Sequence, residues 1–157
     1  MKITVLWVGK TQFEYLKEGI SEYEKRIRNI QPFSVIEIPE IRKGGSLPKE
    51  MLKQAEGEQI LSRLSPSDEV WLMDERGQEY TSSGFSGFLE KKMCSGVKNL
   101  VLVIGGAYGF SDAVYARCQG KISLSQMTFS HQMIRLFLTE QIYRALSILR
   151  GEPYHHE

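Results

Sequence analysis

The sequence predicts an α/β fold in which a parallel sheet is sandwiched between helices. Apolar runs alternate with helical segments along the whole chain, and most of the runs are continuously apolar. Continuous runs are typical of parallel strands covered on both faces, and the alternating order is typical of right-handed helical crossovers. At 157 residues the chain has the size of one domain. We therefore expect a single domain over residues 1–157.

Five apolar runs are expected to form the strands. They cover residues 3–8, 33–38, 69–73, 100–104 and, with the weakest pattern, 121–124. Turns are expected at the segments that separate strands and helices, which include Pro39 with Gly44-Gly45, Arg76-Gly77, residues 105–109 and residues 125–130.

The first helix has the clearest periodicity. Apolar residues recur at steps of three and four, which places them on one stripe of an amphipathic helix: Phe13, Leu16, Ile20, Tyr23, Ile27 and Ile30. A second helix is expected over residues 49–64, with Met51, Leu52, Ala55, Ile60, Leu61 and Leu64 as its apolar residues. Shorter helices are expected over residues 83–94 and from about Ser111-Asp112 onward.

The last helix, residues 131–150, is apolar nearly all round. Ser130 is well placed to cap its start, while Gly151 and Pro153 should end it. A helix of this kind is either buried deeply in its own domain or covered by a partner. A self-complementary dimer contact through the last helix and the first helix is the interpretation that we favour, with Leu138 and Ile142 in the contact.

Composition and charge exclude several classes of protein. The formal charge of +1 argues against a protein that grips nucleic acid mainly by neutralising phosphates. Cys94 and Cys118 lack C-x-x-C spacing, so we interpret them as structural thiols. The histidines have no metal-ligand spacing, so no metal is expected. The N-terminus opens directly into a strand and no run reaches membrane length, so we expect a soluble cytoplasmic protein.

The segments after the predicted strands are the places to search for a site. In parallel sheets ligands bind outside the carboxyl ends of the strands, which here are the segments after Met73, Ile104 and Leu124. The glycines of residues 105–109 would let the backbone approach a ligand closely. This turn is neither G-x-G-x-x-G nor a Walker loop, so a dinucleotide or triphosphate is not expected.

Taken together, these motifs resemble a known family. They are Val8-Gly9-Lys10, Glu22-Tyr23, Glu56-Gly57-Glu58, Val103-Ile104-Gly105-Gly106 with Gly109, Leu124-Ser125, Met127-Thr128-Phe129, His131-Gln132, Glu140 to Ala145 and Pro153-Tyr154-His155. From Met1 to the tail, the chain resembles the ribosomal large-subunit pseudouridine N3-methyltransferases, the RlmH family of the SPOUT, or alpha/beta-knot, methyltransferases. Ser130 and His156 depart from the family pattern, which usually has Pro and a basic residue there.

This resemblance implies a C-terminal trefoil knot, a homodimer and the cofactor S-adenosyl-L-methionine. It also implies methylation of N3 of a pseudouridine in 23S ribosomal RNA, within the assembled ribosome or the large subunit. The cofactor-binding residues that it implies lie at the strand ends chosen above: Met73, Gly105, Leu124, Ser125, Gln126, Met127, Thr128 and Phe129.

Methylation of N3 requires a group that takes a proton from a ring nitrogen. Tyr154, His155 and Glu140 are the candidate catalytic residues. Arg135 and Arg144 are candidates for contact with phosphate or uracil oxygens, although Glu140 and Arg144 at i, i+4 can equally pair with each other on the helix surface. Two alternatives stay open, namely a SPOUT methyltransferase that acts on transfer RNA and a non-catalytic ribosome-binding factor whose glycine turn is only structural.

Overall fold

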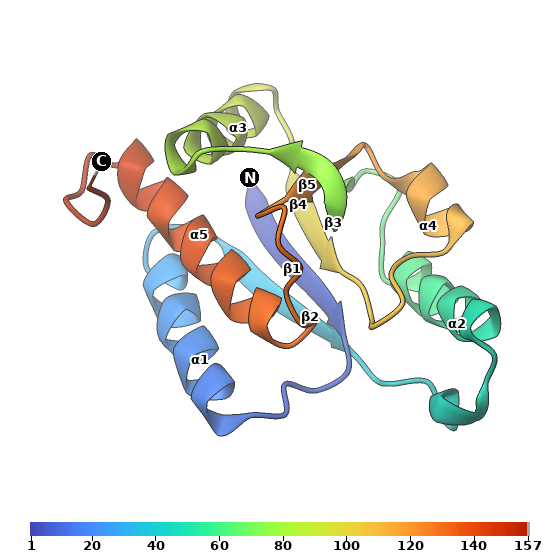
Figure 1. Cartoon of the computed structure of the whole chain (residues 1–157). Helices are drawn as coiled ribbons and strands as arrows, with labels where there is room; N and C mark the ends of the chain where they lie inside the picture. The colour runs from blue at the N-terminus through green and yellow to red at the C-terminus, as the bar shows by residue number, and fades with distance from the viewer. Residues whose placement is uncertain (157) are drawn as a thin grey trace.

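A computed structural model describes residues 1–156 and contains one five-stranded parallel sheet of order β2-β1-β4-β3-β5 (Figure 1). The strands are β1 (Lys2–Val8), β2 (Phe33–Ile38), β3 (Glu69–Glu79), β4 (Asn99–Ile104) and β5 (Gly120–Ser123). The helices are α1 (Glu14–Arg28), the 3₁₀ turn η1 (Gly44–Ser46), α2 (Lys49–Ser62), α3 (Ser82–Cys94), α4 (Asp112–Arg117) and α5 (Met133–Leu149).

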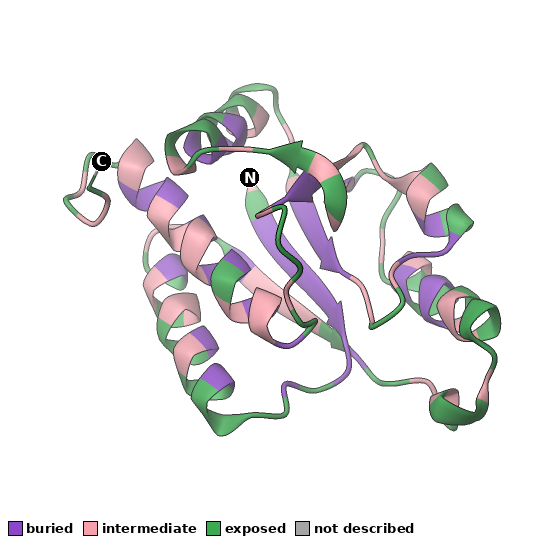
Figure 2. Ribbon diagram, viewed as in Figure 1, coloured by how far each residue is buried: buried purple, intermediate pink, exposed green. Residues whose placement is uncertain are grey.

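Helices cover both faces of the sheet, which confirms the predicted sandwich. Helices α1, α3 and α5 lie on one face, and α2 and α4 lie on the other (Figure 1). Successive residues of β1 alternate between two cores, with Val5 on the α1 and α5 side and Leu6 on the α2 and α4 side. The central strands are therefore buried on both faces, as Figure 2 shows for β1 and β4.

Helix α5 packs on the sheet between α1 and α3. Leu138 and Ile142 are completely buried there, in the core of their own chain. The expectation that these two residues form a dimer contact is therefore wrong, because part of the apolar surface of α5 is covered within the chain. Phe137, on the same helix, remains 40% exposed.

The predicted caps of α5 are present, although the helix begins at Met133 rather than at residue 131. The Ser130 hydroxyl accepts a hydrogen bond from the Met133 backbone N–H at 3.0 Å. At the other end, Gly151 has φ +69°, and Glu152 N–H bonds to the Ser147 carbonyl at 3.0 Å. This is a Schellman motif, which turns the tail away from the helix axis.

Two local predictions fail for identifiable reasons. Arg76-Gly77, expected in a turn, lies inside β3, because a register shift between Met73 and Gln78 lets the strand continue beside β5. In α2, Met51 is 55% exposed although it was expected on the apolar side, and the buried positions include Glu56. No helix within residues 1–156 is long and apolar enough to cross a membrane.

Candidate active site

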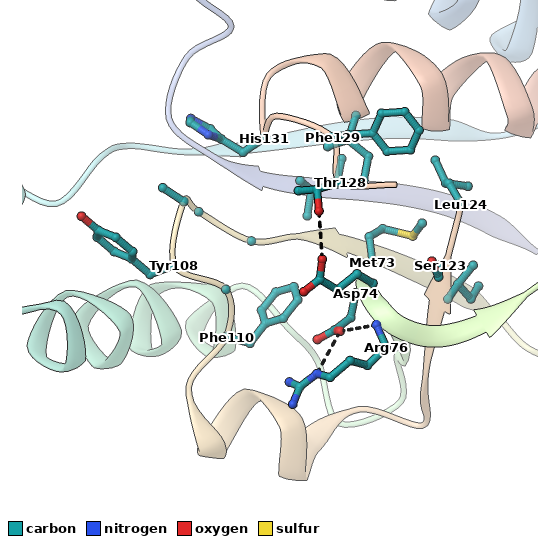
Figure 3. A pocket seen from close by; sticks show the side chains of 18 of the residues that line it. Met73, Asp74, Arg76, Tyr108, Phe110, Ser123, Leu124, Thr128, Phe129 and His131 are labelled. Carbon is teal, nitrogen blue, oxygen red and sulfur yellow. Dashed lines mark hydrogen bonds and ion pairs between the residues drawn. The ribbon is translucent and has the colours of Figure 1, made fainter. Parts of the chain in front are cut away.

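A pocket of about 520 Å³ lies at the carboxyl ends of β3, β4 and β5 (Figure 3). Its walls come from the bulged part of β3, the glycine turn after β4, and the loop between β5 and α5. This volume is in the usual range for small-molecule sites. The pocket thus lies where the strand-end argument placed the search.

The residues implied as cofactor ligands come together at this pocket. Seven of the eight line it: Met73, Gly105, Leu124, Ser125, Met127, Thr128 and Phe129. Gln126 is exposed and is not among the lining residues. Met127 is 79% exposed, so the loop carries an apolar side chain at its open side.

The glycine turn after β4 forms one wall. Gly109 has φ +83°, and its N–H bonds to the Gly106 carbonyl at 3.1 Å, which closes the turn. A Cβ on Gly105 would lie 3.0 Å from the ring of Phe110, which also lines the pocket. A side chain at Gly105 would therefore press first on this aromatic wall.

The bulge in β3 brings three charged side chains to the pocket: Asp74, Glu75 and Arg76. They lie in the segment after Met73 that the strand-end argument selected, although none of them was named as a site residue. The Asp74 carboxylate accepts hydrogen bonds from the Tyr115 hydroxyl and, at 2.8 Å, from the Arg76 backbone N–H. Burial opposes the ionisation of Asp74, but these hydrogen bonds outweigh it and hold its pKa below its usual value. Next to it, Glu75 accepts a hydrogen bond from Thr128 at 3.2 Å, which connects β3 to the loop between β5 and α5.

Arg135 lies beneath this end of the sheet and is only 1% exposed. Its guanidinium donates to the carbonyls of Val8 at 2.7 Å and Gly9 at 3.0 Å and to the Thr11 hydroxyl at 3.0 Å. Burial lowers the pKa of Arg135 to about 10, so it stays charged at neutral pH. The expected contact with RNA does not fit this placement, because the side chain is enclosed and caps the end of β1.

His131 lines the pocket wall, although it was not among the candidate catalytic residues. Burial of its ring and the charge of Arg135 lower its pKa, against the opposing effect of Glu40. The sequence signal that could have identified His131 is its position between the last strand and α5, because ligands bind in the segments that follow parallel strands. At neutral pH the lowered pKa favours the uncharged imidazole.

The three candidate catalytic residues also come together, but outside the pocket, where the tail folds back along the second half of α5. The Glu140 carboxylate accepts from the Tyr154 hydroxyl at 3.0 Å and from Arg144 at 2.6 Å. Arg144 also donates to Nδ1 of His155 at 3.1 Å, and the Tyr23 hydroxyl lies 3.0 Å from that of Tyr154. We call these five residues the tail cluster. The i, i+4 pairing of Glu140 with Arg144 is thus formed.

The pocket and the tail cluster lie at different places along α5. Ile134, in the first turn, lines the pocket, whereas the tail follows Leu149 and folds back to Glu140 near the middle of the helix (Figure 1). Glu140 follows Ile134 by six residues, which is about 9 Å along the helix axis. None of the five residues of the tail cluster lines the pocket of its own chain. Among residues 1–156, no His, Cys, Asp and Glu side chains gather into a set that could hold a metal ion.

The sheet, the strand-end pocket and the glycine turn together define an α/β protein with a candidate small-molecule site. The family described as "Predicted SPOUT methyltransferase" matches residues 1–155. The chain therefore belongs to the SPOUT methyltransferase family.

Proteins named ribosomal RNA large subunit methyltransferase H are similar to this chain over their full length. The one from Porphyromonas gingivalis is 55% identical over 157 residues, which is all of both chains. The one from Cytophaga hutchinsonii is 52% identical over 156 residues, covering 99% of this chain and all of the relative. Among solved structures, the SpoU methyltransferase AviRb from Streptomyces viridochromogenes, in complex with AdoMet, aligns with a TM-score of 0.46 and 13% identity, covering 96% of this chain and 61% of the other.

Proposed function

We propose that this protein transfers the methyl group of S-adenosyl-L-methionine to N3 of a pseudouridine in 23S ribosomal RNA. The observation that carries the proposal is the pocket at the ends of β3, β4 and β5, whose lining includes seven of the eight residues implied as cofactor ligands. The names of the full-length relatives support ribosomal RNA as the substrate class.

The chemistry of the pocket fits this cofactor. Met73, Leu124 and Phe129 offer apolar surface for a flat base, and the turn at Gly105 offers open backbone. Glu75 offers a negative charge to a cofactor that carries a positive sulfonium and an ammonium group. When bound, S-adenosylmethionine supplies an electrophilic methyl group, and the protein must supply position, dryness and a proton acceptor.

We further propose that the tail cluster acts in the pocket of the partner subunit of a homodimer. None of the tail-cluster residues lines the pocket of its own chain, and a second chain in a symmetric dimer could bring both sets of residues to one substrate. In the reaction, N3 of the base gives its proton to the tail and takes the methyl carbon, while sulfur keeps the electron pair of the broken bond.

Within the tail cluster, the contacts favour His155 as the proton acceptor. Burial and the hydrogen bonds with Tyr23 and Glu140 raise the pKa of Tyr154, which keeps its phenol protonated at neutral pH. Because Arg144 can only donate, Nδ1 is the ring nitrogen of His155 that offers a lone pair, and it can take up the proton once Arg144 leaves it for a contact with RNA. We assign Glu140 the role of anchor, since it holds both Tyr154 and Arg144. Arg144 remains our candidate for contact with RNA.

The near-neutral charge supports recognition of a folded ribosomal surface by shape, within the assembled ribosome or the large subunit. The trefoil knot and the cytoplasmic location stay predictions from the resemblance and from the sequence.

Two measurements test the proposed function. Calorimetry with S-adenosylmethionine should show binding, and its absence up to millimolar cofactor would favour a ribosome-binding factor without catalysis. Methyl transfer should then be assayed on ribosomes, isolated large subunits and transfer RNA. Product at N3 of a large-subunit pseudouridine is the expected outcome, and transfer to transfer RNA alone would overturn it.

A further inference from the structure

A buried carboxyl group lies behind the glycine turn of the pocket. Glu56, on α2, is only 9% exposed. Its Oε1 is the one buried side-chain nitrogen or oxygen in residues 1–156 that has no hydrogen-bond partner. Buried polar atoms are nearly always paired, so such an exception calls for a functional or structural reason.

The carboxyl group packs directly against the backbone of the turn. A Cβ on Gly106 would lie 2.6 Å from Oε2 and 2.8 Å from Oε1 of Glu56, so only glycine fits there. Gly106 lines the pocket, whereas Glu56 does not. Glu56 can therefore influence a ligand only through the turn.

The next residue of α2 fixes the far end of the same segment. A Cβ on Gly57 would lie 2.4 Å from the hydroxyl of Ser111, the residue that caps α4. Two consecutive residues of α2 thus contact both ends of the segment 106–111. This packing makes α2 the support against which the glycine turn is held.

Glu56 sits in surroundings that do not favour its charge. Burial, followed by the charge of Glu40, raises its pKa. At neutral pH the buried carboxyl therefore lowers the stability of the protein without ligand. Residues that cost stability beside a binding site are commonly kept for function.

We propose that Glu56 is a positioning residue of the cofactor site, whose carboxyl accepts hydrogen bonds from the backbone N–H groups of Gly106 and Ala107 when the pocket is filled. Gly106 packs against the carboxyl and Ala107 follows it in the turn, so a small shift of the turn could aim these two amides at the carboxyl, which is a strong acceptor. The bond fixes the turn in the shape that binds the ligand. The identity of the ligand, S-adenosylmethionine, rests on the proposed function.

Two variants of Glu56 and one control test this proposal. Glu56→Met keeps the volume and removes the acceptor, Glu56→Gln keeps one acceptor oxygen, and Glu58→Gln changes an exposed carboxylate on the same helix. Each is measured by calorimetry with S-adenosylmethionine and by thermal unfolding without it. We expect the Glu56 variants to melt at or above the temperature of the unmodified protein, because the orphaned carboxyl is gone.

Cofactor affinity should move in the opposite direction. Glu56→Met should raise the Kd at least tenfold, Glu56→Gln should recover part of the loss, and Glu58→Gln should leave the Kd unchanged. The proposal would be overturned if Glu56→Met left the cofactor affinity unchanged. It would also be overturned if Glu56→Gln lowered the stability and left the affinity unchanged, because Glu56 would then be a purely structural residue.

A measurement on the unmodified protein guards against a variant that fails to fold. The amide protons of Gly106 and Ala107 should shift downfield in the NMR spectrum on cofactor binding, and unshifted amides in a saturated complex would also overturn the proposal. If the unmodified protein binds no S-adenosylmethionine, it is the proposed function that fails.

Discussion

The start of α5 and the tail cluster carry different kinds of group. At the start of the helix, an open pocket is walled by apolar side chains, exposed backbone and the charged residues of the β3 bulge. Between the middle of the helix and the tail, Glu140, Arg144 and Tyr154 form hydrogen bonds with one another. The first arrangement has room for a ligand. The second consists of polar groups that do not line this pocket, which is why we assign it to a site completed by another subunit.

Removal of the tail should give the largest effect and is the sharpest test of this contrast. A chain truncated after Glu152 loses Tyr154 and His155 but keeps α5 and the pocket. We expect methyl transfer to fall about 10²- to 10⁴-fold, as for loss of a general base, with cofactor Kd nearly unchanged. Calorimetry and a transfer assay measure the two quantities. Loss of cofactor binding would mean that the tail contributes to the cofactor pocket and that the pocket and the tail cluster are not separate sites.

A mixed dimer tests whether the tail works in trans. One subunit lacks the tail and the other carries Gly105→Val, and the cofactor concentration is kept well below the Kd of the Gly105→Val variant, so each homodimer has low activity for a different reason. Activity regained on mixing places a complete pocket and a complete tail on different chains. His155→Ala and Tyr154→Phe then distinguish the proton acceptor from the phenol.

The next effect concerns Arg135, which joins α5 to β1 at the pocket end. Arg135→Met leaves the carbonyls of Val8 and Gly9 without their donor, so we expect the free energy of unfolding to fall by about 3 kcal/mol. Urea denaturation measures this loss. Arg26→Met, which removes an exposed pair with Glu22, is the matched control and should change little. Equal effects in both would remove the structural role assigned to Arg135.

Substitution of Gly105 should perturb the pocket and leave the tail cluster intact. In Gly105→Val the new side chain presses on Phe110 and displaces one wall. We expect cofactor binding to weaken at least tenfold, which is about 1.4 kcal/mol, in a protein that still folds. Calorimetry and circular dichroism check the two parts. Unchanged affinity would exclude this wall from the cofactor site.

The smallest expected effect is the pH dependence that Asp74 gives to the free energy of unfolding. Because its pKa is lowered in the folded protein, its contribution to stability is present above the unfolded value and is lost as pH falls through the folded value. We expect Asp74→Asn to lower the unfolding free energy by about 1 kcal/mol at neutral pH. Denaturation curves should show this difference shrinking below about pH 4. A difference that is constant with pH would contradict the assignment.

Strand positions and pocket location were predictable because both follow from simple patterns. Continuous apolar runs such as residues 100–104 mark buried parallel strands, and ligands bind at their ends. The roles of Arg135 and Glu56 were not predictable. Both are charged residues that the fold encloses, and enclosure depends on partners distant in sequence, such as Gly9 and Gly106. The bulge in β3 was hidden for the same reason, since only pairing with β5 extends the strand beyond Met73.

The position of β5 has a consequence for local opening of the molecule. This strand has only four residues, pairs with β3 alone and forms an edge of the sheet. The loop between β5 and α5, which lines the pocket, begins directly after it. Short edge elements open at a lower free energy than the whole domain. Backbone amides of Ile122 and Ser123 should therefore exchange with deuterium before those of Leu102 in the centre of the sheet. A ligand that contacts the loop should slow this exchange. The exchange rate of the β5 amides would then report whether the pocket is occupied.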